Sequence, residues 1–119
     1  MFGYTPRGKM TTQTQSNTER AYFLIRLMAP RPTFLQDMTE AEQRVMGEHV
    51  AYWTKLLDEG IAVAFGPVAD PKGPWGVGIV ELDDPAALST LEANDPAIRS
   101  GIGMRYEVLP MVRAVVRPR

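Results

Sequence analysis

The chain contains no cysteine and one histidine among its 119 residues. The lack of cysteine excludes a disulfide framework, a thiol nucleophile and a thiolate metal site. With one histidine and no HExxH pattern, carboxylates would be the main ligands of any metal ion, so we expect no metal site and no cofactor. A chain without cysteine also agrees with a reducing compartment, and we expect a cytoplasmic protein.

Long apolar runs and an excess of charge of either sign are missing as well. No run approaches the roughly 20 apolar residues that a membrane-spanning helix needs, and the N-terminus lacks the apolar segment of a secretory signal. Thirteen Lys and Arg face fourteen Asp and Glu, so the chain has no overall basic field. We therefore expect neither a membrane nor a nucleic acid as a partner.

Motifs for nucleotide binding and for a nucleophilic serine are absent too. The two GxG pairs, at residues 76–78 and 101–103, lack the third glycine and the following helix of a dinucleotide fingerprint. No G-x-S-x-G elbow surrounds a serine. Turn and strand geometry explains these glycines, and neither chemistry is predicted.

The remaining composition is that of one globular domain with a polar N-terminal tail. Residues 1–20 are poor in aliphatic side chains. We expect them to be disordered, because such a segment buries too little apolar area to offset its ordering entropy. Residues 21–119 form the predicted folded domain, which is long enough to bury a core.

Hydrophobic periodicity predicts the order β-α-β-β-α-β, which is the ferredoxin-like arrangement of an α+β domain. A capping box from Thr39 to Glu42 begins the first helix, and Gly60 suits its end. Asp84-Pro85 is predicted to cap the second helix, and residues 29–38, with two prolines, are predicted to be a loop. The predicted strands are residues 21–28, 61–68, 77–82 and 104–111, and the helices are 39–59 and 84–93.

Both faces of the predicted four-stranded antiparallel sheet carry large apolar side chains. In the first strand, Tyr22, Leu24 and Met28 alternate with Phe23, Ile25 and Leu27. The helices can cover one face, and a large apolar patch on the other face is typical of an interface. We therefore predict a homodimer in which two sheets pack face to face into an α+β barrel, with residues 112–116 as an extended arm.

His49 lies on the apolar stripe of the first helix, where a histidine is unusual. The stripe repeats every three or four residues and consists of Val45, Met46, His49, Val50, Trp53, Leu56 and Leu57. An imidazole there can exchange a proton near neutral pH, which makes it a candidate acid or base. The alternative is a core histidine with a structural hydrogen-bond partner.

Asp95 is the candidate partner of His49. In a ferredoxin-like fold the first helix approaches the turn after the second helix, and Asp95 lies on that turn, before Pro96. A carboxylate on one imidazole nitrogen sets the tautomer and raises the basicity of the other nitrogen, so the pair would form a general base. The alternative role of Asp95 is an N-cap, and the two roles are compatible.

Four aromatic side chains are candidates for the walls of a small apolar pocket beside this pair: Trp53, Phe65, Trp75 and Tyr106. Ordinary core packing is the alternative, above all for Trp53 and Phe65. Arg26 is a charge within an apolar strand, and it would either bind an anionic substituent of a ligand or pair with Glu81 or Glu107 across the sheet.

The ordered set of these features resembles the YciI-like, or YCII-related, family. The matching pattern comprises Glu48-His49-Val50, Leu57-Asp58-Glu59-Gly60, Phe65-Gly66-Pro67, Asn94-Asp95-Pro96, and Gly101 ahead of Tyr106-Glu107-Val108. The resemblance implies a dimeric α+β barrel and a His-Asp dyad at His49 and Asp95. One relative is a dehydrochlorinase that acts on a chlorinated hydroxyquinone, so the resemblance also implies that lyase chemistry is within reach of the fold.

Three functions remain open at this point. The leading hypothesis is a cofactor-independent enzyme in which His49 is the base for elimination or isomerisation of a small cyclic carbonyl or quinone-like compound. The main alternative is a non-catalytic module that binds a metabolite or a protein, with a structural His49. A third hypothesis is cofactor-free oxygenation of an electron-rich phenol, which other dimeric α+β barrels perform.

Overall fold

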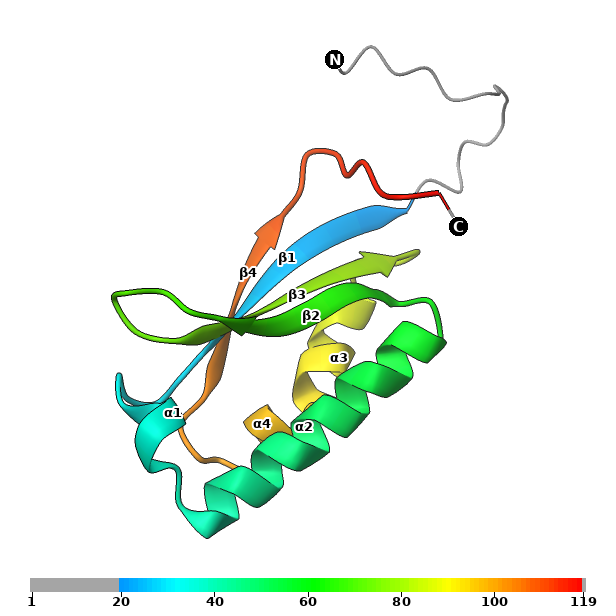
Figure 1. Cartoon of the computed structure of the whole chain (residues 1–119). Coiled ribbons are helices and arrows are strands. Elements are labelled where there is room, and N and C mark those ends of the chain that lie inside the picture. Colours follow the sequence, from blue (N-terminus) through cyan, green and yellow to red (C-terminus); the bar gives the residue numbers. More distant parts are fainter. Residues whose placement is uncertain (1–19, 119) are drawn as a thin grey trace, which may run out of the picture.

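A computed structural model describes residues 20–118 of the chain (Figure 1). Its elements are β1 (Ala21–Met28), α1 (Phe34–Asp37), α2 (Glu40–Asp58), β2 (Ala62–Val68), β3 (Trp75–Leu82), α3 (Ala87–Asn94), α4 (Pro96–Arg99) and β4 (Arg105–Pro110). Of the tail predicted at residues 1–20, residues 1–19 lie outside the described part. Arg20 forms ion pairs with Glu81 and Asp83, at 3.2 and 3.0 Å.

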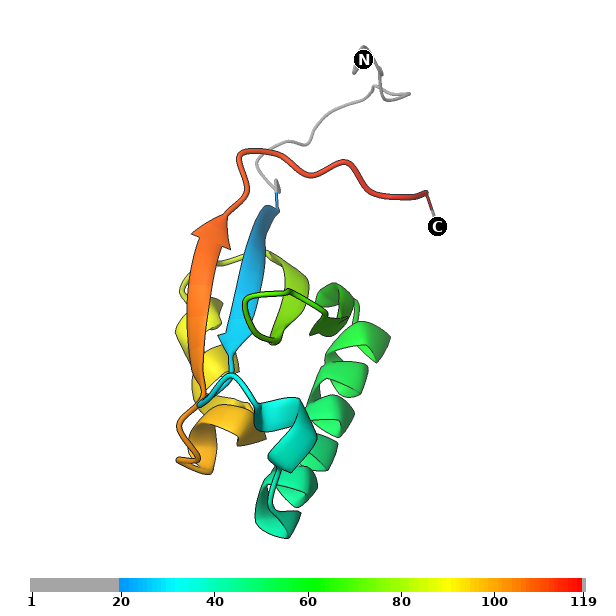
Figure 2. The same cartoon turned by 60° about the vertical axis from the view of Figure 1, so that its left-hand side comes forward.

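The four strands form one antiparallel sheet in the order β2-β3-β1-β4. The long connections place α2 and α3 on the same face of this sheet (Figures 1 and 2). The α+β class and the four-stranded antiparallel sheet predicted from the sequence are therefore confirmed.

The first long helix begins where its capping box predicts. The Thr39 hydroxyl accepts a hydrogen bond from the Glu42 amide at 3.1 Å, and the Glu42 carboxylate accepts one from the Thr39 amide at 2.9 Å. Two amides that the helix leaves free are thus satisfied. Gly60 follows the helix with a φ of +79°, a conformation that is costly for residues with a Cβ.

Three predicted elements differ from the structure by two residues or more. Strand β3 begins at Trp75 rather than at residue 77. Residues 29–38 are not all loop, because they contain the short helix α1. Helix α3 begins at Ala87 rather than directly after Asp84, because the Asp84 carboxylate accepts from the amide of Ala86 and its carbonyl accepts from the amide of Ala87. Asp84 therefore closes a turn that precedes the helix.

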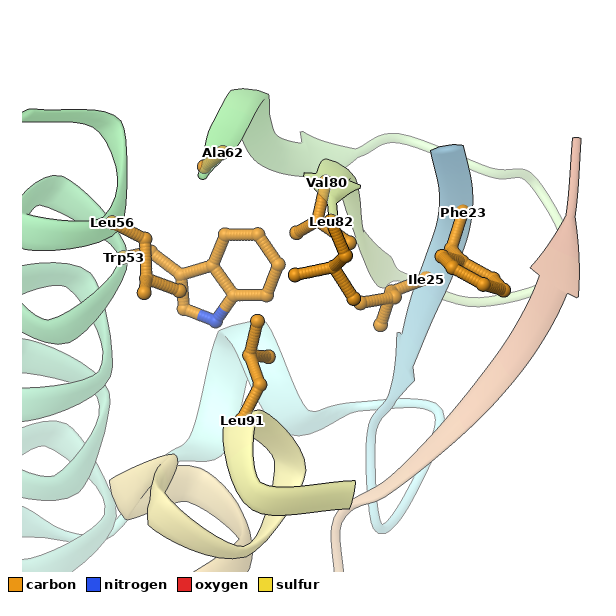
Figure 3. Close-up of a cluster of buried hydrophobic side chains, with 8 residues drawn as sticks. All are labelled: Phe23, Ile25, Trp53, Leu56, Ala62, Val80, Leu82 and Leu91. Atoms are coloured by element: carbon orange, nitrogen blue, oxygen red, sulfur yellow. The ribbon is translucent and has the colours of Figure 1, made fainter. Parts of the chain in front are cut away.

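The core lies between the helix-covered face of the sheet and α2 and α3. It consists of Phe23, Ile25, Trp53, Leu56, Ala62, Val80, Leu82 and Leu91 (Figure 3). The Trp53 indole points from α2 toward β3, where Gly78 leaves space for it. A Cβ at position 78 would lie 2.5 Å from the indole ring, so glycine is required for this close approach.

Candidate functional site

Asp95 is the polar centre of the molecule. It lies between α3 and α4, it is the N-cap of α4, and none of its surface is exposed. Its Oδ1 accepts a hydrogen bond from the Ala97 amide at 2.9 Å. The Asp-Pro step therefore forms the predicted cap, and the same carboxylate has further acceptor capacity that points into the protein.

His49 uses that capacity from the neighbouring helix. Its Nδ1 lies 2.9 Å from Oδ1 and 3.1 Å from Oδ2 of Asp95, and its side chain is mostly buried. The residues are 46 positions apart in the sequence. The structure therefore brings together the two residues that the sequence predicted as a pair.

Two aromatic side chains complete the set of donors around Asp95. The Trp53 indole N–H donates to Oδ2 at 2.9 Å, and the Tyr106 hydroxyl donates to Oδ2 at 2.5 Å. Trp53 lies one helical turn after His49 on α2, and Tyr106 comes from β4. Three side chains and one backbone amide thus donate to this carboxylate, and one buried negative charge holds a helix, a strand and a turn together.

These bonds also set the ionisation of the site. Burial by itself raises the pKa of Asp95, but the hydrogen bonds from His49, Tyr106 and Trp53 outweigh it, and the pKa lies below the ordinary value of 3.8. Burial and the bond to Asp95 raise the pKa of Tyr106. At neutral pH the site therefore holds a carboxylate and a neutral phenol.

A carboxylate at Nδ1 determines which nitrogen of His49 carries the proton. Because an ionised Asp95 can only accept, the neutral imidazole donates from Nδ1, and Nε2 keeps its lone pair. No hydrogen bond to Nε2 occurs within residues 20–118. The arrangement has the form of a base whose orientation is held by a buried anion.

His49 borders an apolar cavity of about 210 Å³. The cavity lies between α2, the segment around α1 and one end of the sheet. Its walls include four of the predicted site residues, namely Trp53, Phe65, Trp75 and Tyr106. The rings of Trp53 and Phe65 are 5.8 Å apart and tilted by 40°. Two of these aromatics are also hydrogen-bonded to Asp95, a role that the sequence did not indicate.

Arg26 does not join this group. It alternates with Ile25 and Leu27, whose buried side chains face the helices, so Arg26 lies on the opposite face of the sheet. There it pairs with Glu107 at 3.4 Å, and its guanidinium lies 4.3 Å from the centre of the Trp75 ring. The structure thus favours the alternative of a cross-strand ion pair, and Arg26 does not border the cavity.

The segment around α1 supplies a cavity wall that the sequence analysis missed. Phe34, Leu35 and Met38 line the cavity from this side. Met46, one turn before His49, and Met104, ahead of β4, line it elsewhere. The apolar stripe predicted for this helix already placed Met46 and His49 on one face, but nothing local in the sequence places Phe34 near either of them.

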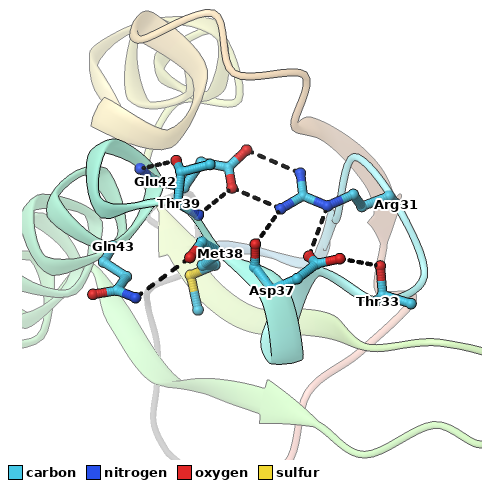
Figure 4. Close-up of polar contacts among 7 residues, drawn as sticks. All are labelled: Arg31, Thr33, Asp37, Met38, Thr39, Glu42 and Gln43. Carbon is cyan, nitrogen blue, oxygen red and sulfur yellow. Dashed lines mark hydrogen bonds and ion pairs between the residues drawn. The ribbon is translucent and has the colours of Figure 1, made fainter.

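Arg31 attaches this wall to the start of α2 (Figure 4). Its guanidinium donates to the Glu42 carboxylate at 2.7 and 3.0 Å and to the Asp37 carboxylate at 2.8 Å. The Thr33 hydroxyl donates to the other oxygen of Asp37 at 2.7 Å. The hydrogen bond from Arg31, followed by that from the Thr39 amide, lowers the pKa of Glu42 to about 2. Arg31 therefore links Asp37, the last residue of α1, to Glu42 in the first turn of α2 through ionised groups.

Two other kinds of feature are absent from residues 20–118. No group of three or more His, Asp or Glu side chains in this range is placed to hold a metal ion. No helix in the described part of the chain has the length and apolarity needed to cross a membrane.

Comparisons with known proteins identify one family and two similar solved structures. The family model of the YCII-related domain matches residues 22–112, which is most of the chain. The solved structure of PA3566 from Pseudomonas aeruginosa is similar, with a TM-score of 0.51, 14% identity, and coverage of 84% of this chain and 100% of that chain. NE2512 from Nitrosomonas europaea, a protein of unknown function, gives a TM-score of 0.47 at 11% identity, covering 86% of this chain and 99% of its own.

None of the curated proteins matches the chain. At 14% identity the likeness to PA3566 concerns the fold alone. The assignment of a reaction must therefore come from the geometry of the site.

Proposed function

This chain belongs to the YCII-related domain family, and on that premise we propose that it is a small enzyme in which His49 is the general base and Asp95 orients it. The substrate is a small cyclic carbonyl or quinone-like compound, and the reaction is elimination or isomerisation. The observation that carries the proposal is the 2.9 Å contact between Nδ1 of His49 and Oδ1 of the buried Asp95, at the wall of a cavity.

The proposed first step is a proton transfer. Nε2 of His49 takes a proton from the carbon next to the carbonyl group, and the electrons of the C–H bond move into an enolate. The buried carboxylate of Asp95 stabilises the imidazolium that forms, because the charge develops 2.9 Å from an existing opposite charge.

The second step distinguishes the two reactions. In an elimination, the enolate electrons expel a leaving group from the adjacent carbon, and the proton remains on His49 until it is released to water. In an isomerisation, His49 returns the proton to a different carbon. Neither route needs an electron donor or acceptor, which suits the proposal that the enzyme uses no cofactor.

Replacement of His49 tests the mechanism. We expect His49→Gln to lower kcat by a factor of about 100 or more while the protein stays folded, because general base catalysis contributes about 10²- to 10⁴-fold. Arg44→Ala, an exposed position on the same helix, is the control. A panel of cyclic ketones and hydroquinones, followed by ultraviolet absorbance, supplies the substrates. Equal turnover by His49→Gln and the unaltered protein would remove the proposed base.

The second candidate function is a non-catalytic binding module of the same fold. The observation that favours it is the number of donors on Asp95, since Trp53, Tyr106 and His49 together form a network that also stabilises the core. A ligand that binds without being converted, with the same affinity in His49→Gln, would support this function over catalysis.

We also propose that the protein is a homodimer. The sheet face opposite the helices carries Leu24 paired with Ile79 on β3 and with Leu109 on β4, and Leu109 is half exposed. An apolar face of this kind is typical of an interface. Sedimentation equilibrium should give twice the chain mass, and Leu109→Asp should shift the protein toward the monomer. A monomeric mass for the unaltered chain would contradict the proposal.

A further inference from the structure

The cavity beside His49 has walls that offer almost no unused hydrogen-bonding group. Four of its lining residues carry side-chain N–H or O–H groups: His49, Trp53, Trp75 and Tyr106. Trp75 borders the cavity from the end of β3, opposite Met28, and its ring lies against Arg26 on the other face of the sheet. Trp53, Tyr106 and Nδ1 of His49 donate to Asp95, and the Trp75 indole donates to Asp70 at 3.0 Å. Each of these N–H and O–H groups therefore already donates to a carboxylate outside the cavity.

What remains for a ligand is one side-chain nitrogen. Nε2 of His49 is an acceptor when Nδ1 donates to Asp95. The rest of the wall that side chains provide is aliphatic, aromatic or thioether, with Phe34, Met46 and Met104 among them. A ligand that carries one hydrogen-bond donor matches this wall, whereas each further polar group would lose its water without gaining a side-chain partner.

The cavity wall also lacks a positive charge. No Lys or Arg from the described part of the chain lines it. Arg26 contacts the Trp75 ring from the other face of the sheet, where its charge is paired with Glu107. The buried Asp95 carboxylate lies directly behind His49 and repels a second anion. A carboxylate or phosphate ligand would therefore enter without a permanent counter-charge.

The volume of the cavity and the chemistry of its walls indicate a ligand with a single ring. A cavity of about 150 Å³ lined by apolar side chains holds one benzene molecule in another protein, and the present cavity of about 210 Å³ leaves room for small substituents. Aromatic faces and thioether sulfurs, such as those of Phe65 and Met46, make favourable contacts with an aromatic ring.

We propose that this cavity selects an uncharged, single-ring aromatic compound that presents one hydroxyl or N–H donor to Nε2 of His49, and that it rejects carboxylates and phosphates of the same size. The proposal rests on the site of the proposed function, and within that substrate class it favours hydroxylated rings, such as hydroquinones, over ketones and quinones that carry no donor. It concerns binding and does not require turnover. A phenolic hydroxyl is the simplest donor of this class.

Three probes of matched size test it on the unaltered protein: phenol, anisole and benzoate. We expect phenol to bind in the cavity with a Kd of about 1 mM, given its seven heavy atoms. Anisole, which has no donor, should bind at least about fivefold more weakly. Benzoate should give no saturable binding at pH 7.5. The indole shift of Trp53 and the amide shifts of Gly66 and Gly78, which line the cavity, locate and quantify the binding in ¹H–¹⁵N NMR.

A variant gives a second readout. His49→Leu keeps an apolar wall but removes the acceptor, so phenol and anisole should then bind equally. Equal binding of the two by the unaltered protein, tighter binding of benzoate than of phenol, or no binding of phenol at the cavity would each overturn the inference. Phenol selectivity without turnover of any ring compound would support the inference while it removes the proposed function.

Discussion

Nδ1 of His49 and Oδ1 of Asp95 lie 2.9 Å apart, although the two residues are 46 positions apart in the sequence. The contact joins the middle of α2 to the N-cap of α4, and α2 and α4 pack together beside it. A carboxylate that caps one helix thus also holds the imidazole of another. Stability and the proposed chemistry therefore depend on the same charge.

The tautomer of His49 is the first prediction. Because the ionised Asp95 accepts from Nδ1, the neutral imidazole should carry its proton on Nδ1. The chain has one histidine, so ¹⁵N NMR gives a single pair of ring resonances to assign. In Asp95→Asn, whose side chain is no longer an anion, we expect the Nδ1–H tautomer to lose population. An Nε2–H tautomer in the unaltered protein would contradict this reading of the pair.

The hydroxyl of Tyr106 should contribute more to stability than that of Tyr52. Tyr106 donates to the charged Asp95, whereas Tyr52 donates to the backbone carbonyl of Leu91 at 2.8 Å. Hydrogen bonds to charged groups are worth about 1.5–3 kcal/mol and neutral ones about 1 kcal/mol. Urea unfolding of Tyr106→Phe and Tyr52→Phe compares them directly. A larger loss of unfolding free energy in Tyr52→Phe than in Tyr106→Phe would show that the Tyr106 hydroxyl adds little to the stabilisation of the Asp95 carboxylate.

A methyl group at position 78, on β3, should destabilise the protein by colliding with the Trp53 indole. In Gly78→Ala the new Cβ would lie 2.5 Å from the Trp53 ring, so either the indole or β3 must move, at a cost of about 1–3 kcal/mol. Gly47→Ala is the control, because its Cβ meets nothing within 4 Å and alanine favours a helix by about 0.5–1 kcal/mol. We expect the midpoint temperature of thermal unfolding to fall for Gly78→Ala and to rise for Gly47→Ala.

Acid should weaken the attachment of α1 to α2. The pKa of Glu42 falls from 4.5 to about 2 on folding, mainly through Arg31. A lowered pKa in the folded state means that the stabilisation is complete above pH 4.5 and is lost as the pH falls toward 2. Glu42→Gln keeps an oxygen for the capping box but removes the charge. The stability of this variant should therefore depend less on pH in this window. The unfolding free energies of the variant and of the unaltered protein should converge near pH 2.

Glu40→Gln, at an exposed carboxylate in the same turn of α2, is the control for that experiment. If Glu42→Gln and the unaltered protein lose stability in parallel between pH 4.5 and 2, then the ion pair with Arg31 does not hold α1 in solution.

Much of this protein follows from interactions among residues that are close in the sequence. The capping box at Thr39 and the cap at Asp95 each join residues two or three positions apart, so local spacing is sufficient to predict them. The alternation in β1 follows from the two-residue period of a strand. The Asp-Pro step and the apolar stripe of α2 were likewise enough to nominate Asp95 and His49 as candidates.

Only the tertiary structure decided what those residues contact. Both faces of β1 are apolar, so the sequence did not show which face the helices cover, and Arg26 turned out to lie on the uncovered one. The donation of Trp53 and Tyr106 to Asp95 depends on strand register and on the approach of α2 to α4, which connect residues 42 and 11 positions apart. Local propensity carries no information about such distances, because they are set by how the faces of the elements pack against one another.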